Sequence, residues 1–308
     1  MNFSKRLRAE GKGFRLADRD PKFHGDLSRE SAETLQAAQL VELQSLQDRL
    51  YADDTHSVLL VLQGMDAAGK DGIIKHVMSG VNPAGCEVHP FKAPSAVELD
   101  HDYLWRCHQK VPERGRIGIF NRSYYEEVLV VRVHPEILDR QRLPAGSTKQ
   151  PKIWERRYRE IRDFEQQLHD NGTRVVKCLL HISPEEQYDR FLQRIDDPSK
   201  NWKFEAGDVK ERESWHCYQE AFEEMVRATS TDDAPWHVIP ADRKWFARVA
   251  VSAILLDALK EIGPAYPDVS DEHRKELQKI RERLVAGGKR PKAPKGPKGP
   301  KGPKAPKP

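Results

Sequence analysis

Hydrophobic and polar positions along the chain form two kinds of segment, short continuous apolar runs and longer amphipathic stretches. The run "SVLLVLQ" (57–63) is rich in leucine and β-branched residues, as expected of a strand that is buried on both faces. Residues 28–51 begin at Ser28, a candidate helix cap, and place leucines at helical spacing. This alternation predicts βαβ units, and therefore an α/β fold with a parallel sheet flanked by helices.

The same pattern predicts the remaining elements of a single domain that spans residues 1–286, because no internal repeat is visible there. Further strands are expected at 86–91, 116–120, 173–182 and 236–240. Helices are expected at 96–110, 122–133, 151–170, 184–195, 208–228, 244–261 and 271–285.

The net charge of +4 is unevenly distributed over the 308 residues. Residues from Gly287 to Pro308 contain eight basic side chains and no acidic ones, so the rest of the chain carries a net charge of −4. This segment repeats Lys-Gly/Ala-Pro with period three, which predicts a disordered tail of polyproline II character. Two roles stay open, a solvated solubility tail or a tether for a polyanion such as nucleic acid, polyphosphate or an acidic membrane.

Membrane and secretory classes do not fit this chain. The N-terminal segment is charged throughout, and no apolar run approaches the 18 residues of a membrane span. The four cysteines are widely spaced without a C-x-x-C pair, so neither a disulfide framework nor a zinc ribbon is indicated. We expect a cytoplasmic protein with free thiols and no membrane association.

The segment "GMDAAGKDG" (64–72) matches the phosphate loop G-x-x-x-x-G-K, and it lies between the buried strand 57–63 and a helical sequence. Its glycines allow a tight backbone path, its amides and the helix N-terminus donate to phosphate oxygens, and its lysine adds a positive charge. The predicted phosphate- and nucleotide-binding residues here are Gly64, Met65, Ala67, Ala68, Gly69, Lys70, Asp71 and Gly72.

Two aspartates make this phosphate loop unusual. Asp71 stands where the loop normally has the Ser or Thr that holds Mg²⁺ between nucleotide phosphates. Because a carboxylate in the first turn of a helix is favoured by the helix dipole, we expect a structural role for Asp71. Asp66 would repel phosphate unless a divalent cation lay between them, so it is a candidate to bind Mg²⁺ or to orient an attacking phosphate oxygen.

A second polar segment, "NRSYYEEVLVVRVHPE" (121–136), follows the strand 116–120. Asn121 and Arg122 offer a neutral amide and a guanidinium, a pair that suits phosphate clamping more than tight metal ligation. Glu126, Glu127 and Arg132 follow as further nucleotide-site candidates, with a solvated helix face as the alternative.

A third segment, residues 190–215, combines basic side chains with a helix-breaking proline and is typical of a closing lid, which we place at about 194–215. Exposed charged helices are the alternative interpretation. Trp202 is expected either to stack on a base or to pack within the lid. The basic residues are Arg190, Arg194, Lys200, Lys203 and Arg212.

Four segments together closely resemble the polyphosphate kinase 2 family, namely "GMDAAGKDG", "IGIFNRSYYEEVLVVRVHPE", "RIDDPSKNWKF" and "APWHVIPADRKWFARVAVSAIL". The resemblance covers roughly residues 12–265 and leaves the basic tail outside. It implies a thymidylate-kinase-like P-loop kinase fold with a helical lid. It also implies phosphoryl transfer between inorganic polyphosphate and nucleotides that depends on Mg²⁺, with Mn²⁺ as an alternative ion.

Carried over by position, the resemblance makes Asp66 and Lys70 the Walker A pair and Asn121 and Arg122 the Walker B site. Asp66, Lys70 and Arg122 become the catalytic candidates, and Asp66 and Asn121 the metal candidates. Many family members have Asp in place of Asn121, and this departure argues against a second directly bound Mg²⁺. The lid contacts implied in this way are Arg194, Lys200 and Lys203.

The string Asn-Arg-Ser-Tyr-Tyr-Glu-Glu resembles the subgroup that phosphorylates both AMP and ADP. The expected partners are polyphosphate, adenine nucleotides (guanine nucleotides as an alternative) and other copies of the chain in a homo-oligomer. Nucleic acid would bind only weakly, through the tail. The favoured direction, the polyphosphate chain length, the base selectivity and the roles of Glu126 and Glu127 stay open.

Two other functions remain as alternatives. An ATP-dependent nucleoside monophosphate kinase would share the fold, but Asp71 and the basic lid argue against it. A non-catalytic binder of polyphosphate or nucleic acid would leave Lys70 and Asp66 unexplained. A GTPase switch is disfavoured because the chain has no N-K-x-D motif to read guanine.

Overall fold

The computed structural model describes residues 1–149, 151–204 and 206–287. It divides the chain into two compact units, Met1–Tyr266 and Pro267–Pro308, which are described separately. The predicted boundary between domain and tail at residues 286 and 287 therefore lies inside the second unit. The predicted disorder from residue 288 to 308 concerns residues outside the described ones.

The first unit is built on a six-stranded sheet of order β1-β6-β5-β2-β4-β3. All neighbours pair in parallel except β1, which is antiparallel to β6. The predicted parallel sheet is thus confirmed, and each predicted strand lies within one residue of its expected bounds. The strand β1 is too short to produce an alternating pattern. The bounds are β1 (Arg8–Ala9), β2 (Ser57–Gly64), β3 (Cys86–Pro90), β4 (Ile117–Asn121), β5 (Thr173–His181) and β6 (Trp236–Pro240).

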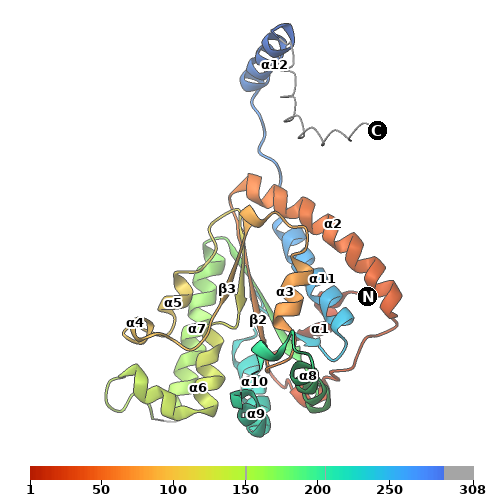
Figure 1. The fold of residues 1–308 in the computed structure, drawn as a ribbon. Helices are drawn as coiled ribbons and strands as arrows, with labels where there is room; N and C mark the ends of the chain where they lie inside the picture. Colours follow the sequence, from red (N-terminus) through yellow and green to blue (C-terminus); the bar gives the residue numbers. More distant parts are fainter. Residues whose placement is uncertain (150, 205, 288–308) are drawn as a thin grey trace, which may run out of the picture. The chain divides into compact units, whose positions relative to one another are not determined.

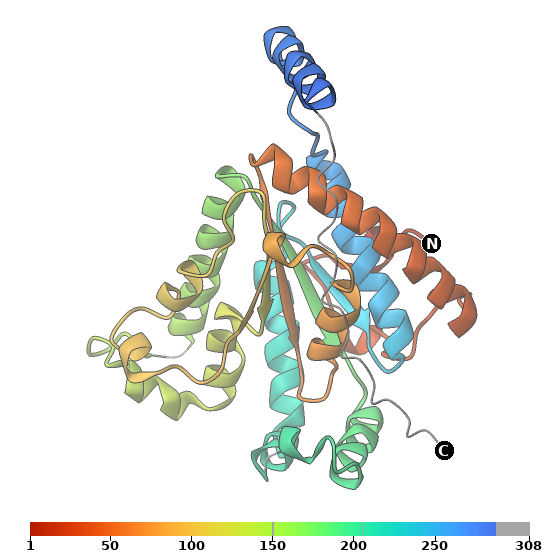
Figure 2. The same cartoon turned by 45° about the horizontal axis from the view of Figure 1, so that its top comes forward.

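Helices cover both faces of this sheet (Figure 1). One layer contains α2, α3 and α11, and the other contains α7 and α10; the view in Figure 2 shows the same layers turned. The bounds are α1 (Phe3–Leu7), α2 (Arg29–Asp53), α3 (Lys70–Val77), α4 (Ala96–Leu99), α5 (Trp105–His108), α6 (Val130–Val133), α7 (Lys152–Asp170), α8 (Pro184–Asp196), α9 (Ala206–Glu213), α10 (Trp215–Thr229) and α11 (Lys244–Ile262). The 3₁₀ segments are η1 (Leu16–Asp18), η2 (Pro83–Gly85), η3 (Tyr124–Val128), η4 (Pro135–Gln141) and η5 (Asn201–Lys203).

The second unit contains one helix, α12 (Asp271–Ala286), among its described residues, close to the predicted 271–285. Its N-terminus is capped by Ser270, and it buries no side chain. Across the described part of both units, no helix has the length and apolar content that crossing a bilayer requires.

Three segments that were each predicted as one continuous helix are not continuous helices in the structure. Residues 96–110 form only α4 and α5, and residues 208–228 are interrupted at Ser214. Residues 122–133 fail to start as a helix because Arg122 has φ of 65° and Ser123 is extended. A 3₁₀ turn begins instead after Ser123, whose hydroxyl accepts a hydrogen bond from the Tyr125 amide at 3.2 Å.

The order of the strands creates a crevice at the carboxyl end of β2. From β2 the chain builds β3 and β4 on one side and β5 and β6 on the other, which is the topological switch point where α/β sheets bind ligands. Leu62 is in register with Asn121, and Gly64 is in register with Leu180. The phosphate loop therefore meets the ends of β4 and β5.

A buried ion pair ties the turn η3 to the core. Lys177 on β5 and Glu165 on α7 lie 2.7 Å apart with side chains 0% and 2% exposed. The hydroxyls of Tyr124 and Tyr125 donate to Glu165 at 2.8 and 2.7 Å, and Lys177 also donates to the Thr229 carbonyl. Burial lowers the pKa of Lys177, and these bonds offset that cost. The network holds the segment that immediately follows Arg122.

Candidate active site

The phosphate loop has the strand, loop and helix context that the sequence predicts. β2 ends at Gly64, whose φ is 150° and where a Cβ atom would lie 2.7 Å from the Leu180 carbonyl oxygen, so no larger residue fits. Ala67 and Gly69 also have positive φ values, 62° and 109°, and the chain then enters α3. The loop therefore turns tightly and directs the N-terminus of α3 toward the site, an arrangement suited to phosphate.

Lys70 lies folded over this loop. Its Nζ atom donates to the Gly64 carbonyl at 2.7 Å and to the Met65 carbonyl at 3.2 Å. Because an ammonium group has three donors, these two bonds leave one for a phosphate oxygen. Burial, reinforced by the nearby Arg122 charge, lowers the pKa of Lys70 to about 8, against the opposing effect of Asp66 and other carboxylates.

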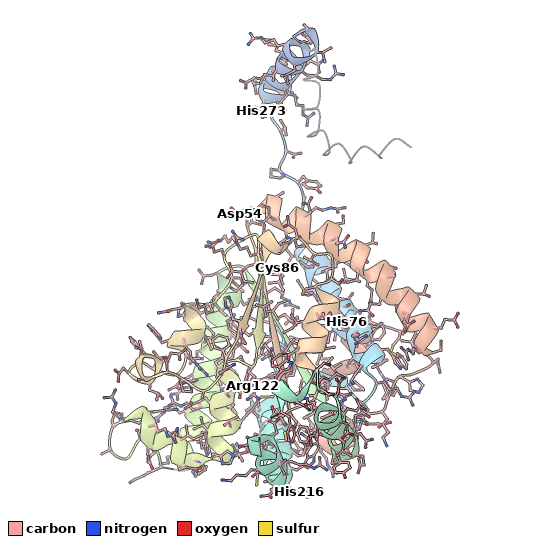
Figure 3. The ribbon with its side chains drawn as sticks, in the orientation of Figure 1. Asp54, His76, Cys86, Arg122, His216 and His273 are labelled. Carbon is pink, nitrogen blue, oxygen red and sulfur yellow. The ribbon has the colours of Figure 1, made fainter. Side chains whose placement is uncertain are left out.

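Arg122 joins the phosphate loop to the end of β4. Its guanidinium lies 2.6 Å from an Asp66 carboxylate oxygen and 3.2 Å from a Glu126 carboxylate oxygen. These two charges, Glu126 first, raise the pKa of Arg122. Figure 3 shows Arg122 at the lower end of the sheet. The structure thus brings together three residues that the sequence singled out in two separate segments.

Asn121 and Asp71 form a second contact across the same edge. The Asn121 amide nitrogen donates to an Asp71 carboxylate oxygen at 2.8 Å. Asp71 also lies in the first turn of α3, close to Gly72, where the helix dipole favours a carboxylate. This position agrees with the structural role expected for Asp71. It also leaves the amide oxygen of Asn121 as the atom that a cation would contact.

The residues present suit a loosely held cation. Among the described residues, no group of three or more His, Cys, Asp or Glu side chains is placed to hold a metal ion. Mg²⁺ generally retains several waters and binds through one or two carboxylates together with substrate phosphates. Asp66, with Asn121 close to the loop, therefore fits Mg²⁺ better than an ion that needs a complete protein cage.

Beside Arg122 lies a pocket of about 240 Å³, bounded by the loop from Phe91 to Arg106 and by the turns η3 and η4. Both Glu126 and Glu127 line it, but they make different contacts. Glu127 is buried and pairs with Arg157 at 3.0 Å, and burial raises its pKa. Glu126 instead pairs with Arg122, and through Arg122 it is linked to Asp66 of the phosphate loop.

The predicted lid residues lie on α8, η5 and α9. The Arg194 guanidinium is 3.7 Å from Asp208, and Lys200 is 2.6 Å from Asp197. Trp202 is 77% exposed and donates to the Ser199 carbonyl, so it does not pack within a lid core as one of its two predicted roles required. Stacking on a base stays a prediction.

Two further predicted residues complete this comparison. Arg132 on α6 contacts Glu224 on α10 and donates to the Tyr158 hydroxyl at 2.7 Å, so it holds helices together beside the site. The side chain of Lys203 is outside the described part of the chain. The phosphate-binding roles of both residues stay predictions.

Two side chains of α8 donate hydrogen bonds to backbone carbonyls of the phosphate loop, a role that the sequence did not indicate. Gln187 donates to the Asp66 carbonyl at 3.0 Å. Arg190, interpreted from sequence as a lid cation, is 4% exposed and donates to the Ala67 and Ala68 carbonyls at 2.8 and 2.9 Å. Gln187 and Arg190 are three positions apart, and residues at this spacing share one face of a helix, so the spacing could have indicated that both meet the same neighbour.

A smaller cavity lies between the phosphate loop and the lid helices. It is lined by Asp66, Arg122 and Glu126 on one side and by Glu211 and Tyr218 on the other. The Tyr218 hydroxyl donates to Glu211 at 2.5 Å, which joins α10 to α9. Tyr218 had no distinguishing sequence signal, because it occupies an ordinary apolar position of an amphipathic helix.

Comparison with known proteins agrees with this geometry. The family model described as Polyphosphate kinase 2 (PPK2) matches residues 26–265. An ADP-polyphosphate phosphotransferase of Rhodopseudomonas palustris is 52% identical over 258 residues, which cover 84% of this chain and 89% of that protein. An AMP/ADP-polyphosphate phosphotransferase of Meiothermus ruber is 49% identical over 225 residues, or 73% of this chain and 80% of that protein.

A solved structure is similar over nearly the whole chain. The crystal structure of polyphosphate kinase 2 from Arthrobacter aurescens TC1 superimposes with a TM-score of 0.83 at 40% sequence identity, covering 92% of this chain and 97% of that one. This likeness confirms the predicted P-loop kinase fold, and the family match covers the phosphate loop, the end of β4 and the lid. The chain belongs to the polyphosphate kinase 2 family.

Proposed function

We propose that this protein transfers phosphoryl groups between inorganic polyphosphate and adenine nucleotides, converting AMP to ADP and ADP to ATP in a reversible, Mg²⁺-dependent reaction. The names of the relatives support both acceptors, since one is named for ADP and the other for AMP and ADP. The four cysteines are free thiols, which suits a reducing, cytoplasmic compartment.

The ion-pair network Asp66–Arg122–Glu126 is the observation that carries this proposal. Phosphoryl transfer needs little covalent participation by the protein, because positioning and charge neutralisation dominate. Lys70 and Arg122 place two cations beside one loop, where they would neutralise the phosphoryl group as it moves. Asp66 would orient the attacking phosphate oxygen or hold the metal.

The acceptor nucleotide is assigned to the pocket of about 240 Å³ beside Arg122. Its wall combines aromatic side chains, Phe91 and Tyr103, with the cations Arg106 and Arg140. Such a mixture suits a base and sugar at one end and phosphate at the other. Glu126 would hold Arg122 in place, whereas Glu127 would shape the wall through Arg157.

Mg²⁺ would be held by Asp66, with the amide oxygen of Asn121 nearby, and when bound it supplies charge neutralisation between donor and acceptor phosphates. Mn²⁺ has similar ligand preferences and could replace it. The protein's own contribution is to present one carboxylate without a competing cage of ligands.

The proposal is tested by separating nucleotides chromatographically after the protein is mixed with Mg²⁺, polyphosphate and either AMP or ADP. We expect ADP and ATP from AMP, and ATP from ADP. Replacing polyphosphate with ATP as the donor to AMP tests the nucleoside monophosphate kinase alternative. Efficient transfer from ATP alone, or binding of polyphosphate without turnover, would contradict the proposal.

Variants of the loop test the assignment of residues. Asp66→Asn and Lys70→Ala are each expected to lower kcat by orders of magnitude, about 10²-fold or more, because they remove charge at the reacting group. Lys75→Ala is a matched control, since Lys75 is an exposed lysine on the same helix. Near-normal turnover of the loop variants with an intact fold would show that the reaction occurs elsewhere.

A further inference from the structure

The N-terminal segment forms a separate concave surface that the proposed reaction does not use. This surface, the N-terminal basic pocket, has a volume of about 620 Å³ and is lined entirely by residues between Asn2 and Arg19. Its carboxylates are Glu10 and Asp18. Its six cations are Lys5, Arg6, Arg8, Lys12, Arg15 and Arg19.

Apolar residues in this segment anchor it and leave the cations on the outside. Phe3 and Leu7 of α1 are buried, with Phe3 packed 5.9 Å from the Phe246 ring of α11. Phe14 and Leu16 are buried as well. The Leu16 amide donates to a Glu223 carboxylate on α10 at 2.7 Å. The segment that forms the basic pocket is therefore fixed to the domain by buried side chains and by a hydrogen bond to α10.

Most of the cations have no ionic partner within the described part of the chain. Arg8 pairs with Asp232 at 2.7 Å, whereas no ion pair there joins Lys5, Lys12 or Arg15 to a carboxylate, and all three are exposed. Residues 1–286 carry a net charge of −4, so this positive surface belongs to a part of the chain that is acidic as a whole.

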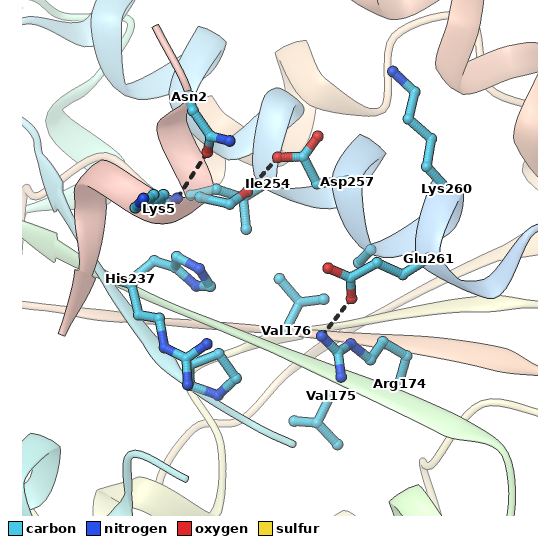
Figure 4. A pocket seen from close by; sticks show the side chains of 14 residues that line it. Asn2, Lys5, Arg174, Val175, Val176, His237, Ile254, Asp257, Lys260 and Glu261 are labelled. Carbon is cyan, nitrogen blue, oxygen red and sulfur yellow. Dashed lines mark hydrogen bonds and ion pairs between the residues drawn. The ribbon is translucent and has the colours of Figure 1, made fainter. Parts of the chain in front are cut away.

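The adjoining pocket shows the contrasting arrangement (Figure 4). It shares Asn2, Lys5 and Arg8 with the basic pocket, but its other charged side chains each have a polar partner. Arg174 lies 2.6 Å from Glu261, and Asp257 accepts a hydrogen bond from Ser4 at 2.5 Å. The N-terminal basic pocket, with six cations and two carboxylates, therefore has a larger excess of positive charge than this neighbour.

A short series of contacts connects the basic pocket to the phosphate loop. Arg19 donates to the carbonyls of Arg6 and Arg8, and two residues later the Pro21 carbonyl accepts from the Asp242 amide at 3.2 Å. The carbonyl of Asp242 accepts from Arg190, the residue that bonds the phosphate loop. The segment thus extends along β6, from its amino end, where Arg8 pairs with His237, to its carboxyl end, where the Asp242 carbonyl accepts from Arg190.

We propose that the N-terminal basic pocket binds distal phosphates of a long polyphosphate chain whose end lies at the phosphate loop, an inference that rests on the proposed function. A polyanion with one charge per phosphate matches a row of unpaired cations. A nucleic acid fits less well, because single-stranded binders stack bases on exposed aromatic rings, and the only aromatic residue lining this pocket, Phe14, is buried.

Every residue that lines the pocket precedes residue 26, where the match to the family model begins. Two contacts on one chain raise affinity only for polyphosphates long enough to reach both. The pocket therefore favours long donors without changing the chemistry at Lys70 and Asp66.

The test compares two triple variants of the full chain. Lys5→Gln/Lys12→Gln/Arg15→Gln removes three cations from the pocket. The matched control, Lys110→Gln/Arg114→Gln/Arg159→Gln, removes three exposed cations elsewhere in the same unit. For each protein, the Kd of long polyphosphate and the Kd of a single-stranded oligonucleotide are measured by titration over a range of salt concentrations. Turnover is measured with long polyphosphate and with the shortest chain that the unmodified protein uses.

We expect the pocket variant to bind long polyphosphate about tenfold more weakly, with a slope of log Kd against log salt reduced by about 2. Its kcat and its turnover of the shortest chain are expected to stay unchanged, and the control variant is expected to keep its affinity for long polyphosphate.

Unchanged affinity of the pocket variant for long polyphosphate, or an equal loss of affinity in the control variant, would overturn the proposal. A loss confined to a single-stranded oligonucleotide would assign the pocket to nucleic acid. An unmodified protein that binds polyphosphate without turnover contradicts the proposed function, while the binding comparison still decides the role of the pocket.

Discussion

Lys70 is expected to make phosphate binding sensitive to pH above 8. Its pKa is lowered to about 8, chiefly by burial, so the free site carries the ammonium charge below pH 8 and loses it above. A bound phosphate favours the charged form, so binding weakens above pH 8, by about tenfold per pH unit once the pH is well above 8 and until the pKa of the complex is reached. We therefore expect kcat/KM for ADP to fall about fivefold between pH 8 and 9.

The assay is a pH profile of kcat/KM from 7 to 10 at saturating Mg²⁺. Phosphate monoesters are fully ionised in this range, since their second pKa is about 6. Burial raises the pKa of Cys86 to about 11 and that of Cys107 to about 12, so these thiols stay neutral in this window. Lys70→Arg is the matched variant, because its guanidinium keeps its charge and its profile is expected to stay flat, whatever its absolute rate.

Titration of Lys70 does not by itself promote unfolding in this pH range. Between pH 8 and the ordinary lysine value of 10.5, the unfolded state binds more protons at Lys70 than the folded state does. The contribution of Lys70 to the free energy of unfolding therefore increases with pH in this window. A wild-type profile that is flat to pH 10, or an equal decline in Lys70→Arg, would refute the reasoning.

Three other outcomes are expected. Lys177→Met should lower the free energy of unfolding in urea by about 3–5 kcal/mol, because it leaves Glu165 buried without its cation, and Lys177→Met/Glu165→Leu should recover part of that loss. Gly64→Ala should abolish turnover and lower Tm, since its Cβ would lie 2.7 Å from the Leu180 carbonyl oxygen, and normal turnover would contradict that geometry. Chelation of divalent cations should stop turnover reversibly without changing Tm, because no three-ligand metal group forms part of the fold among the described residues; a drop in Tm would count against this.

The sequence alone determined the parallel sheet and the phosphate loop. Both are local signals, since continuous apolar runs identify strands such as 57–63 and the glycine spacing of 64–72 specifies the loop that follows. The sequence was less informative about where helices begin, and the helix predicted over residues 122–133 does not begin at residue 122. Arg122 has a positive φ, and the turn that follows it is held by Glu165 and Lys177, which contact Tyr125 from 40 and 52 residues away in sequence.

Only the tertiary structure decided which charges meet. Asp66 and Arg122 are 56 positions apart, and they pair because β2 and β4 are neighbours in register at the switch point. Packing around the turn η3 likewise separates the adjacent Glu126, which pairs with Arg122, from Glu127, which pairs with Arg157. Local periodicity places a charge on an element, but strand order and packing decide what lies opposite it. The cations near the N-terminus likewise form one pocket only because Phe3, Leu7, Phe14 and Leu16 fold that segment onto the domain.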